Sequence, residues 1–215
     1  INTEPHGDHF TGNYFFEGTI VAHEGTRAAI LASSVEQFKE RLKQTAPESL
    51  ALVKDFSYRP PTITLSERLT LYVGNHTFQL ISLPGHTPFE VAVYIPEEKV
   101  AFTTDNIFCR VKTWLQQAVP YEWLESLKRI EALGAEVLVP GHGSICDCSY
   151  IPEQCAIVQA WIDGVTACIK QGLSPKEAEE KLAKVDPYSA ETGGEQQTRM
   201  IQSISVAHLY EILKK

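Results

Sequence analysis

The sequence has few cationic side chains and no long run of apolar residues. Lysine and arginine total 19 against 27 aspartates and glutamates, which gives a formal net charge of -8. A protein that tracks nucleic-acid phosphates normally shows the opposite balance or a basic cluster, so we expect no nucleic-acid partner. No apolar segment approaches the roughly 18 to 20 residues that span a bilayer. We therefore expect a soluble protein with no membrane partner.

Cysteines are also few. They number five, an odd count at irregular spacing, which suits reduced thiols better than a disulfide framework. Cys146, Cys148 and Cys155 lie close together in the chain, but their spacing is not that of a zinc-ribbon pair. We interpret them as reduced thiols and expect a cytoplasmic location.

Hydrophobic periodicity predicts an α/β protein with a helical C-terminal third, large enough to bury a core. Alternating or β-branched segments predict strands at 19–23, 69–73, 78–83, 91–95, 100–103 and 137–139. Apolar residues at helical spacing predict helices at 27–42, 120–133, 153–170, 175–182 and 195–213. Ser174, directly before Pro175, is the predicted N-cap of the helix at 175–182. Gly74-Asn75 predicts a hairpin turn, and the four central strands in succession predict a largely antiparallel sheet.

Four short segments concentrate histidines and carboxylates at strand ends or in tight turns. The first runs from Glu4 to His9 and packs two imidazoles and two carboxylates into six positions, a density that is costly unless a cation is present. The others are Pro84-Gly85-His86, the aspartate Asp105 after a strand, and Pro140-Gly141-His142. Imidazole and carboxylate are common ligands of divalent transition metals, so these segments predict a centre for two adjacent metals. Of the remaining histidines, His23 and His76 are expected to be structural, and His208 is expected to be a surface or interface residue.

The order and contexts of these segments resemble the metallo-β-lactamase-fold hydrolase superfamily. That family has a His-x-His-x-Asp-His loop, then a Pro-Gly-His turn, an aspartate after a strand and a final Gly-His turn, and the corresponding segments occur here in order over residues 3–143. The resemblance implies an αββα sandwich over residues 1–150, incomplete at its N-terminal half. It also implies a helical region over residues 151–215, packed on the same domain or at a subunit interface.

The resemblance also implies the ligand set and the cofactor. His6 and His86 would hold a first metal, Asp8, His9 and His142 a second, and Asp105 would bridge the two. The expected cofactor is a pair of divalent ions, normally zinc. Asp8 would also act in catalysis by orienting a metal-activated hydroxide.

The first loop departs from the family at one position, where Glu4 stands in place of a histidine. As a ligand, Glu4 would add negative charge and shift metal preference toward manganese or iron. Alternatively, Glu4 faces away and the first metal site is weak or empty.

The start of the chain departs further. Family members have roughly 50 to 70 residues of strands before the metal loop, and this chain has three residues and begins at Ile1. It is either a processed product or part of a longer chain. A sheet truncated in this way would expose an apolar face and an open edge. We expect a second polypeptide to supply those strands within an oligomer.

Three functions remain open from the sequence. The first is a metal-dependent hydrolase acting on a small ester, lactone or thioester, or on an activated aryl ether of the nitroaryl methyl ether type. The second is an iron-dependent redox enzyme of the same fold, which Glu4 permits. The third is a non-catalytic subunit of a hetero-oligomer whose metal site has decayed.

Overall fold

The computed structural model describes residues 1–214. The chain forms two compact units, one over Ile1–Ser66 and one from Glu67 onward. The predicted ligands are divided between them. The loop from Glu4 to His9 lies in the first unit, whereas His86, Asp105 and His142 lie in the second.

The first unit is mostly helical. Its elements are α1 (Gly7–Phe10), η1 (Thr11–Phe15), β1 (Val21–His23), α2 (Glu24–Ala32), α3 (Val35–Thr45), η2 (Pro47–Val53) and β2 (Ile63–Leu65). Strands β1 and β2 pair in parallel, with Ala22 opposite Thr64. Because such a pairing needs a crossover connection, the intervening helices and loop are the link between these two strands.

The single helix predicted over 27–42 is wrong, because the structure has two helices there. Helix α2 ends at Ala32, and Ser34 caps the start of α3 by accepting a hydrogen bond from the Gln37 N–H at 3.2 Å. Serine is among the favoured residues at this position, since its side chain satisfies a free N–H of the first turn. The two adjacent serines are therefore the local signal for the break.

The second unit is built on a five-stranded sheet in the order β3-β4-β5-β6-β7. The strands are β3 (Arg68–Val73), β4 (His76–Ser82), β5 (Val91–Ile95), β6 (Val100–Cys109) and β7 (Val137–Gly143). Neighbours from β3 to β6 are antiparallel, as the sequence predicts, whereas β7 pairs with β6 in parallel. Gly74 has a φ of 61° in the predicted hairpin turn, a conformation that glycine adopts without steric cost.

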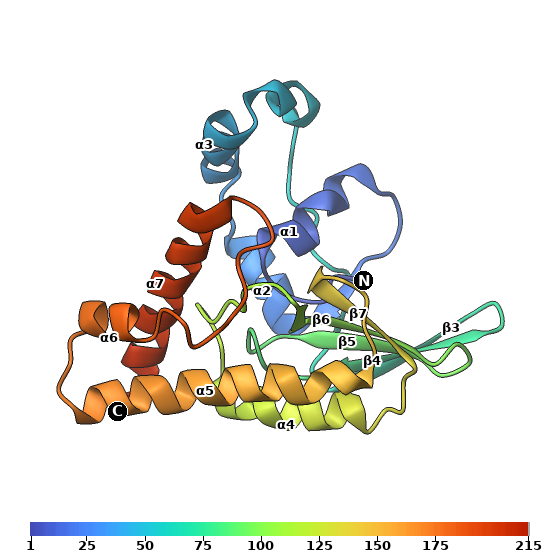
Figure 1. The fold of residues 1–215 in the computed structure, drawn as a ribbon. Helices are drawn as coiled ribbons and strands as arrows, with labels where there is room; N and C mark the ends of the chain where they lie inside the picture. The colour runs from blue at the N-terminus through green and yellow to red at the C-terminus, as the bar shows by residue number, and fades with distance from the viewer. Residues whose placement is uncertain (215) are drawn as a thin grey trace. The chain divides into compact units, whose positions relative to one another are not determined.

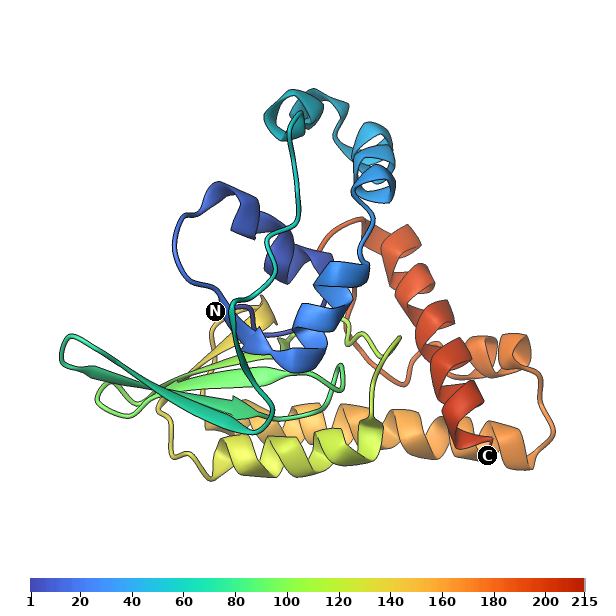
Figure 2. The ribbon, with the colours of Figure 1, turned by 180° about the vertical axis from the view of Figure 1, so that it is seen from behind.

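Helices cover one face of this sheet. Figures 1 and 2 show α4 (Pro120–Glu131) and α5 (Ile151–Lys170) side by side along it, with α6 (Pro175–Lys181) and α7 (Gly194–Leu213) beyond them. A short helix, η3 (Cys148–Tyr150), precedes α5. Ser174 and Glu177 form a reciprocal capping box at the start of α6, which confirms Ser174 as the predicted cap.

One hydrophobic core holds the sheet and these helices together. Trp123, Leu127 and Ile130 from α4 and Trp161 and Val165 from α5 are all fully buried within it. Their spacing of three or four residues puts them on one face of each helix. The segments on either side of residue 150 therefore share a core. Among the described residues, no helix has the length and apolar character needed to cross a bilayer.

Candidate metal centre

The second unit places an aspartate between two imidazoles. Asp105 is buried on β6, His86 follows β4 in the Pro-Gly turn, and His142 lies near the end of β7. The Oδ2 atom of Asp105 lies 3.7 Å from Nε2 of His86 and 3.5 Å from Nε2 of His142. These residues are far apart in sequence. They meet because β6 and β7 are neighbouring strands and the turn after β4 brings His86 close to Asp105.

The other ring nitrogen of each histidine faces an acceptor. His86 donates from Nδ1 to the carbonyl oxygen of Trp114 at 2.7 Å, and His142 donates from Nδ1 to Oε2 of Glu191 at 2.9 Å. A carbonyl or carboxylate oxygen only accepts, so Nδ1 must carry the proton in both rings. In the neutral rings Nε2 therefore keeps its lone pair, and both lone pairs are on the side of Asp105.

A close backbone approach sets the position of His86. A Cβ atom at Gly85 would stand 1.9 Å from Oδ1 of Asn106, so only glycine fits. Asn106 accepts from the His86 N–H at 3.3 Å and donates to the Leu83 carbonyl at 2.7 Å. The residue next to Asp105 therefore fastens the His86 turn to β6.

An aromatic side chain lies against both imidazoles. The ring of Phe108 stacks on His142 at 5.5 Å and an interplanar angle of 10°, and it meets His86 edge-on at 5.3 Å. Trp123 lies 6.0 Å from His86 and donates from its indole to the Asn106 carbonyl at 3.0 Å. Since Phe108 and Trp123 are fully buried, the two histidines pack against side chains of the hydrophobic core.

The first unit carries the other predicted ligands in one short loop. The buried carboxylate of Glu4 has Oε2 at 2.9 Å from Nδ1 of His6 and Oε1 at 3.4 Å from Nε2 of His9. The His6 N–H also donates to Oε1 at 2.8 Å. Asp8 lies on α1, with Oδ2 at 3.5 Å from Nε2 of His9 and its side chain 59% exposed. Glu4 thus points at the imidazoles of its own loop.

An asparagine pair holds this loop in place. Asn2 donates to the His9 carbonyl at 2.9 Å and exchanges two side-chain hydrogen bonds with Asn13, at 2.9 and 2.8 Å. Asn13 in turn exchanges bonds with the backbone and guanidinium of Arg59. Sequence reasoning missed Asn2, Asn13 and Arg59, because their partners lie as far as 46 positions away.

The donor sets fit divalent transition metals. In the second unit, the Nε2 atoms of His86 and His142 lie within 3.7 Å of one carboxylate oxygen of Asp105. Imidazole nitrogens and carboxylate oxygens are common ligands of divalent transition metals. Imidazole suits zinc and iron, while the additional carboxylates in the loop of the first unit favour harder ions such as manganese.

Comparison with known protein families identifies the lineage. Residues 1–142 match the family model described as the metallo-beta-lactamase superfamily. The chain belongs to this superfamily. The resemblance seen in the four ligand segments is therefore confirmed.

Relatives in the superfamily carry the names of several hydrolases. The chain is 35% identical over 80 residues to a hydroxyacylglutathione hydrolase of Mesorhizobium japonicum, which is 37% of this chain and 31% of that enzyme. It is 26% identical over 143 residues to a linear primary-alkylsulfatase of Pseudomonas sp., which is 60% of this chain and 26% of the sulfatase. The chain thus spans about a third or less of the length of these curated relatives.

Solved structures share the fold. A metallo-beta-lactamase family protein from Thermus thermophilus superposes with a TM-score of 0.67 at 21% identity, covering 98% of this chain and 72% of that one. A stereoselective inverting sec-alkylsulfatase from Pseudomonas sp. gives a TM-score of 0.68 at 14% identity over 97% and 40% of the two chains. The α/β fold with a helical C-terminal region, as predicted from the sequence, is confirmed.

Glu191 lies outside the stretch that the superfamily model matches, and sequence reasoning missed it. It is on the segment between α6 and α7, 49 positions from His142. No motif surrounds it, and the neighbouring Gly193-Gly194 pair indicates only a turn. Its role is visible solely from the contact with His142.

The three remaining histidines have structural contacts. His23 caps α2 by accepting from the Gly25 N–H at 3.0 Å, and its Nε2 donates to the Ser66 carbonyl at 3.2 Å. His76 pairs with Glu98 at 2.7 Å across the neighbouring hairpins. His208 donates to the Ala118 carbonyl at 2.9 Å. The contacts of His23 and His76 agree with the structural roles expected for them.

Among the described residues, the five cysteines are free thiols. Burial raises the pKa of Cys146 to about 12, with a further contribution from the neighbouring thiol of Cys109. Burial also raises the pKa of Cys148 and Cys155. Thiols with raised pKa values are poor nucleophiles near neutral pH, so none of these three is equipped for nucleophilic catalysis.

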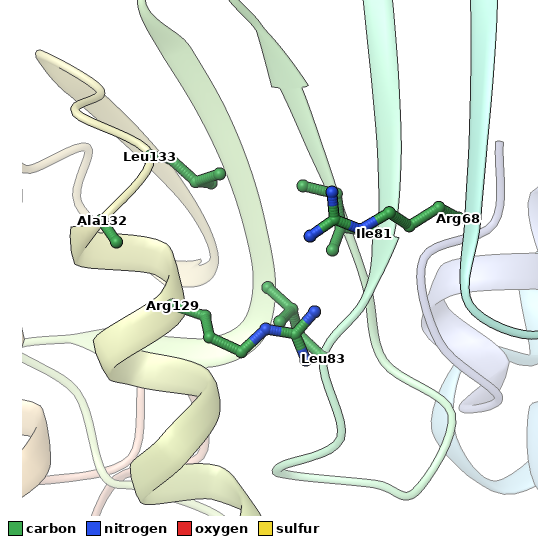
Figure 3. A pocket seen from close by; sticks show the side chains of 6 residues that line it. All are labelled: Arg68, Ile81, Leu83, Arg129, Ala132 and Leu133. Carbon is green, nitrogen blue, oxygen red and sulfur yellow. The ribbon is translucent and has the colours of Figure 1, made fainter.

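A separate cavity of about 230 Å³ lies between α4 and the β3–β4 part of the sheet. Figure 3 shows its lining, with the guanidinium groups of Arg68 and Arg129 over the apolar side chains of Ile81 and Leu83. None of the predicted metal ligands lines this cavity.

Proposed function

We propose that the chain is a divalent-metal-dependent hydrolase that acts on a small ester-like substrate. The observation that carries the proposal is the placement of the Asp105 carboxylate oxygen between two imidazole Nε2 atoms whose Nδ1 protons are already donated elsewhere. Membership of the superfamily, matched over residues 1–142, supports the same function.

The proposed ligand assignment follows the family pattern. His6 and His86, together with Glu4, would hold one ion, whereas Asp8, His9 and His142 would hold a second. Asp105 would bridge them. The expected cofactor is two zinc ions, with manganese or iron as alternatives because of Glu4. Bound ions of this kind lower the pKa of water toward neutrality and polarise the substrate carbonyl.

The chain's own residues would orient and confine the reaction. Asp8, whose exposed carboxylate lies next to His9, would orient the attacking hydroxide by accepting its hydrogen bond. Phe108 and Trp123 pack against the ring of His86. Misplacement of a reacting group can cost about 10²-fold in rate.

The names of two relatives support a substrate class. Those named hydroxyacylglutathione hydrolase and atrochrysone carboxyl ACP thioesterase point to thioesters. Esters and lactones present the same acyl carbon to the attacking water. An activated aryl ether of the nitroaryl methyl ether type is a further candidate.

The test is hydrolysis by the metal-loaded protein of a thioester, an aryl ester, a lactone and a nitroaryl methyl ether. We expect turnover of at least one, its loss after exhaustive chelation, and its return when zinc or manganese is restored. Asp8→Asn should reduce the rate about 100-fold. Asp55→Asn, at an exposed position of the same unit, should not. Full activity after complete metal removal would overturn the proposal.

One observation favours a second candidate, an iron-dependent redox enzyme. The Glu4 carboxylate points at both His6 and His9, and a carboxylate-rich donor set suits iron better than an all-imidazole one. A coloured protein with iron bound after purification from its own host would support this alternative. A metal-free protein that also fails to take up added ions would instead support the non-catalytic subunit.

Assembly and location remain predictions from the sequence. A second polypeptide and an oligomer would appear as additional mass in native mass spectrometry of the protein from its own host. The five free thiols suit a reducing compartment, so we propose a cytoplasmic location, which cell fractionation tests.

A further inference from the structure

The carboxylate of Glu191 binds both the side chain and the backbone of the β7 terminus. Its Oε2 accepts from Nδ1 of His142 at 2.9 Å, and its Oε1 accepts from the Gly143 N–H at 3.2 Å. We infer that Glu191 is a positioning residue that prepares His142 to bind metal. This inference rests on the proposed function, because it assigns His142 as a ligand.

The segment that carries Glu191 is anchored upstream by the buried side chains of Lys112 and Asp186. Lys112 and Asp186 are each about 2% exposed. The Lys112 ammonium donates to the Asp186 carbonyl at 3.2 Å and lies 5.6 Å from the ring centre of Trp161. The side chain of Asp186 accepts from the Thr113 N–H at 2.8 Å and from the Tyr188 N–H at 3.0 Å.

Backbone bonds continue this anchoring up to Glu191 itself. The Lys112 N–H donates to the Ser189 carbonyl at 2.8 Å, and the Ala190 N–H donates to Oγ1 of Thr198 on α7 at 2.8 Å. The residue immediately before Glu191 is thus fixed to α7. Hydrogen bonds therefore hold the segment that positions the Glu191 carboxylate next to His142. The Glu191 side chain is itself 46% exposed.

The chemical effect follows from the identity of the acceptor. A carboxylate on Nδ1 fixes the tautomer, orients the ring and makes Nε2 a better donor to a metal. His86 has a backbone carbonyl in the same place, which no side-chain substitution removes. Loss of such a partner typically weakens metal binding by 10- to 100-fold. The structure thus predicts an asymmetric effect, confined to the ion that His142 binds.

The first measurement is zinc affinity of the full chain, by competition with a chromophoric chelator. We expect Glu191→Ala to weaken one of two bound ions about 10- to 100-fold and to leave the other unchanged. Glu191→Gln, which retains one neutral acceptor, should have a smaller effect. Glu195→Gln is the matched control, because Glu195 is exposed at the start of α7 and pairs with Arg199, and it should bind zinc like the wild type.

The second measurement does not need metal. Long-range proton–nitrogen NMR of the metal-free protein reports which ring nitrogen of His142 carries the proton. We expect the Nδ1–H form in the wild type and a mixture of tautomers in Glu191→Ala, at an unchanged melting temperature. A purely structural role would move the melting temperature and leave the tautomer alone.

The two measurements separate failure of the inference from failure of the proposed function. If the wild type binds zinc and Glu191→Ala keeps both its affinity and its tautomer, the inference is overturned. If the wild type binds no zinc but the tautomer still depends on Glu191, positioning of the ring stands and the metal-dependent function fails. If Glu191→Ala unfolds, Glu191→Gln gives the same comparison with less perturbation.

Discussion

Gly141 lies directly against the carboxylate of Asp105. A Cβ atom at Gly141 would stand 1.8 Å from Oδ1 and 3.0 Å from the carbonyl carbon of Thr104. No side chain fits at this position while the buried aspartate keeps its orientation. A glycine before His142 is thus required for the observed placement of Asp105.

The first prediction is that Gly141→Ala displaces Asp105 and weakens metal binding at least 10-fold. Overpacking of this kind should also cost about 1–3 kcal/mol in the free energy of unfolding. Isothermal titration with zinc and urea unfolding measure the two effects. Gly12→Ala is the control, since its Cβ would meet nothing within 4 Å. If the Gly141→Ala variant binds zinc like the wild type, this assignment of Gly141 is contradicted.

The second prediction concerns metal preference. Glu4→His replaces a carboxylate with the imidazole found in the family loop, which should raise the ratio of zinc to manganese affinity at least 10-fold. Competition between the two ions, read by native mass spectrometry, measures the ratio. Glu17→His, at an exposed site of the same unit, should leave the ratio unchanged. An unaltered ratio in Glu4→His would show that Glu4 does not bind metal.

The third prediction uses the buried pair of Lys112 and Asp186. Burial raises the pKa of the Asp186 carboxyl and lowers that of the Lys112 ammonium. Lys112→Met removes the hydrogen bond to the Asp186 carbonyl and the cation near the buried carboxylate, and it should cost about 1–3 kcal/mol at pH 7. Urea unfolding measures the loss. Lys128→Met, on the exposed face of α4, should change the free energy of unfolding little.

The sign of the pH dependence follows from the raised pKa of the Asp186 carboxyl. Because its pKa is raised by folding, Asp186 binds a proton more readily in the native state than in the unfolded chain. Its contribution to the free energy of unfolding therefore falls as the pH rises from about 3.9, the unfolded value, through the native value. The loss in free energy of unfolding of Lys112→Met, relative to the wild type at the same pH, should accordingly be smaller at pH 5 than at pH 7. Equal destabilisation at both values would exclude an uncompensated carboxylate as the cause.

The fourth prediction concerns the thiols. With a pKa of about 12, Cys146 is almost entirely protonated near neutrality, so its alkylation rate should rise about 10-fold per pH unit up to that value. Iodoacetamide labelling followed by peptide mass spectrometry measures the rate, with N-acetylcysteine as the reference. Hydrolytic activity should survive treatment at pH 7. Rapid labelling of Cys146 at pH 7 would contradict the raised pKa.

The turns that carry the predicted ligands could be recognised in the sequence. Pro-Gly-His after a strand and the dense run from Glu4 to His9 are short-range patterns, whereas the assignment of their side chains as ligands stays a prediction. The hairpin at Gly74 and the Ser174 cap were predicted for the same reason. These features depend on a few neighbouring residues and on backbone rules that single sequences express.

Long-range features were not predictable in this way. Strand β6 extends to Cys109 rather than ending near Thr103, and its register with β7 shifts between Phe102 and Phe108. That irregularity depends on the pairing with β7, which no local pattern encodes. Glu191 was missed for the same reason, since its contact with His142 depends on how α5, α6 and α7 return the chain to the sheet.

The segment between α6 and α7 joins an exposed surface to His142, a proposed metal ligand, and this has a thermodynamic consequence. Coupling free energies are reciprocal. If the contact between Glu191 and His142 strengthens metal binding, a bound ion stabilises the closed conformation of this segment by the same free energy. A protease that cleaves next to Glu191 would then cut the metal-loaded protein more slowly than the metal-free one. Limited proteolysis at this one exposed site thus becomes a reporter of metal occupancy.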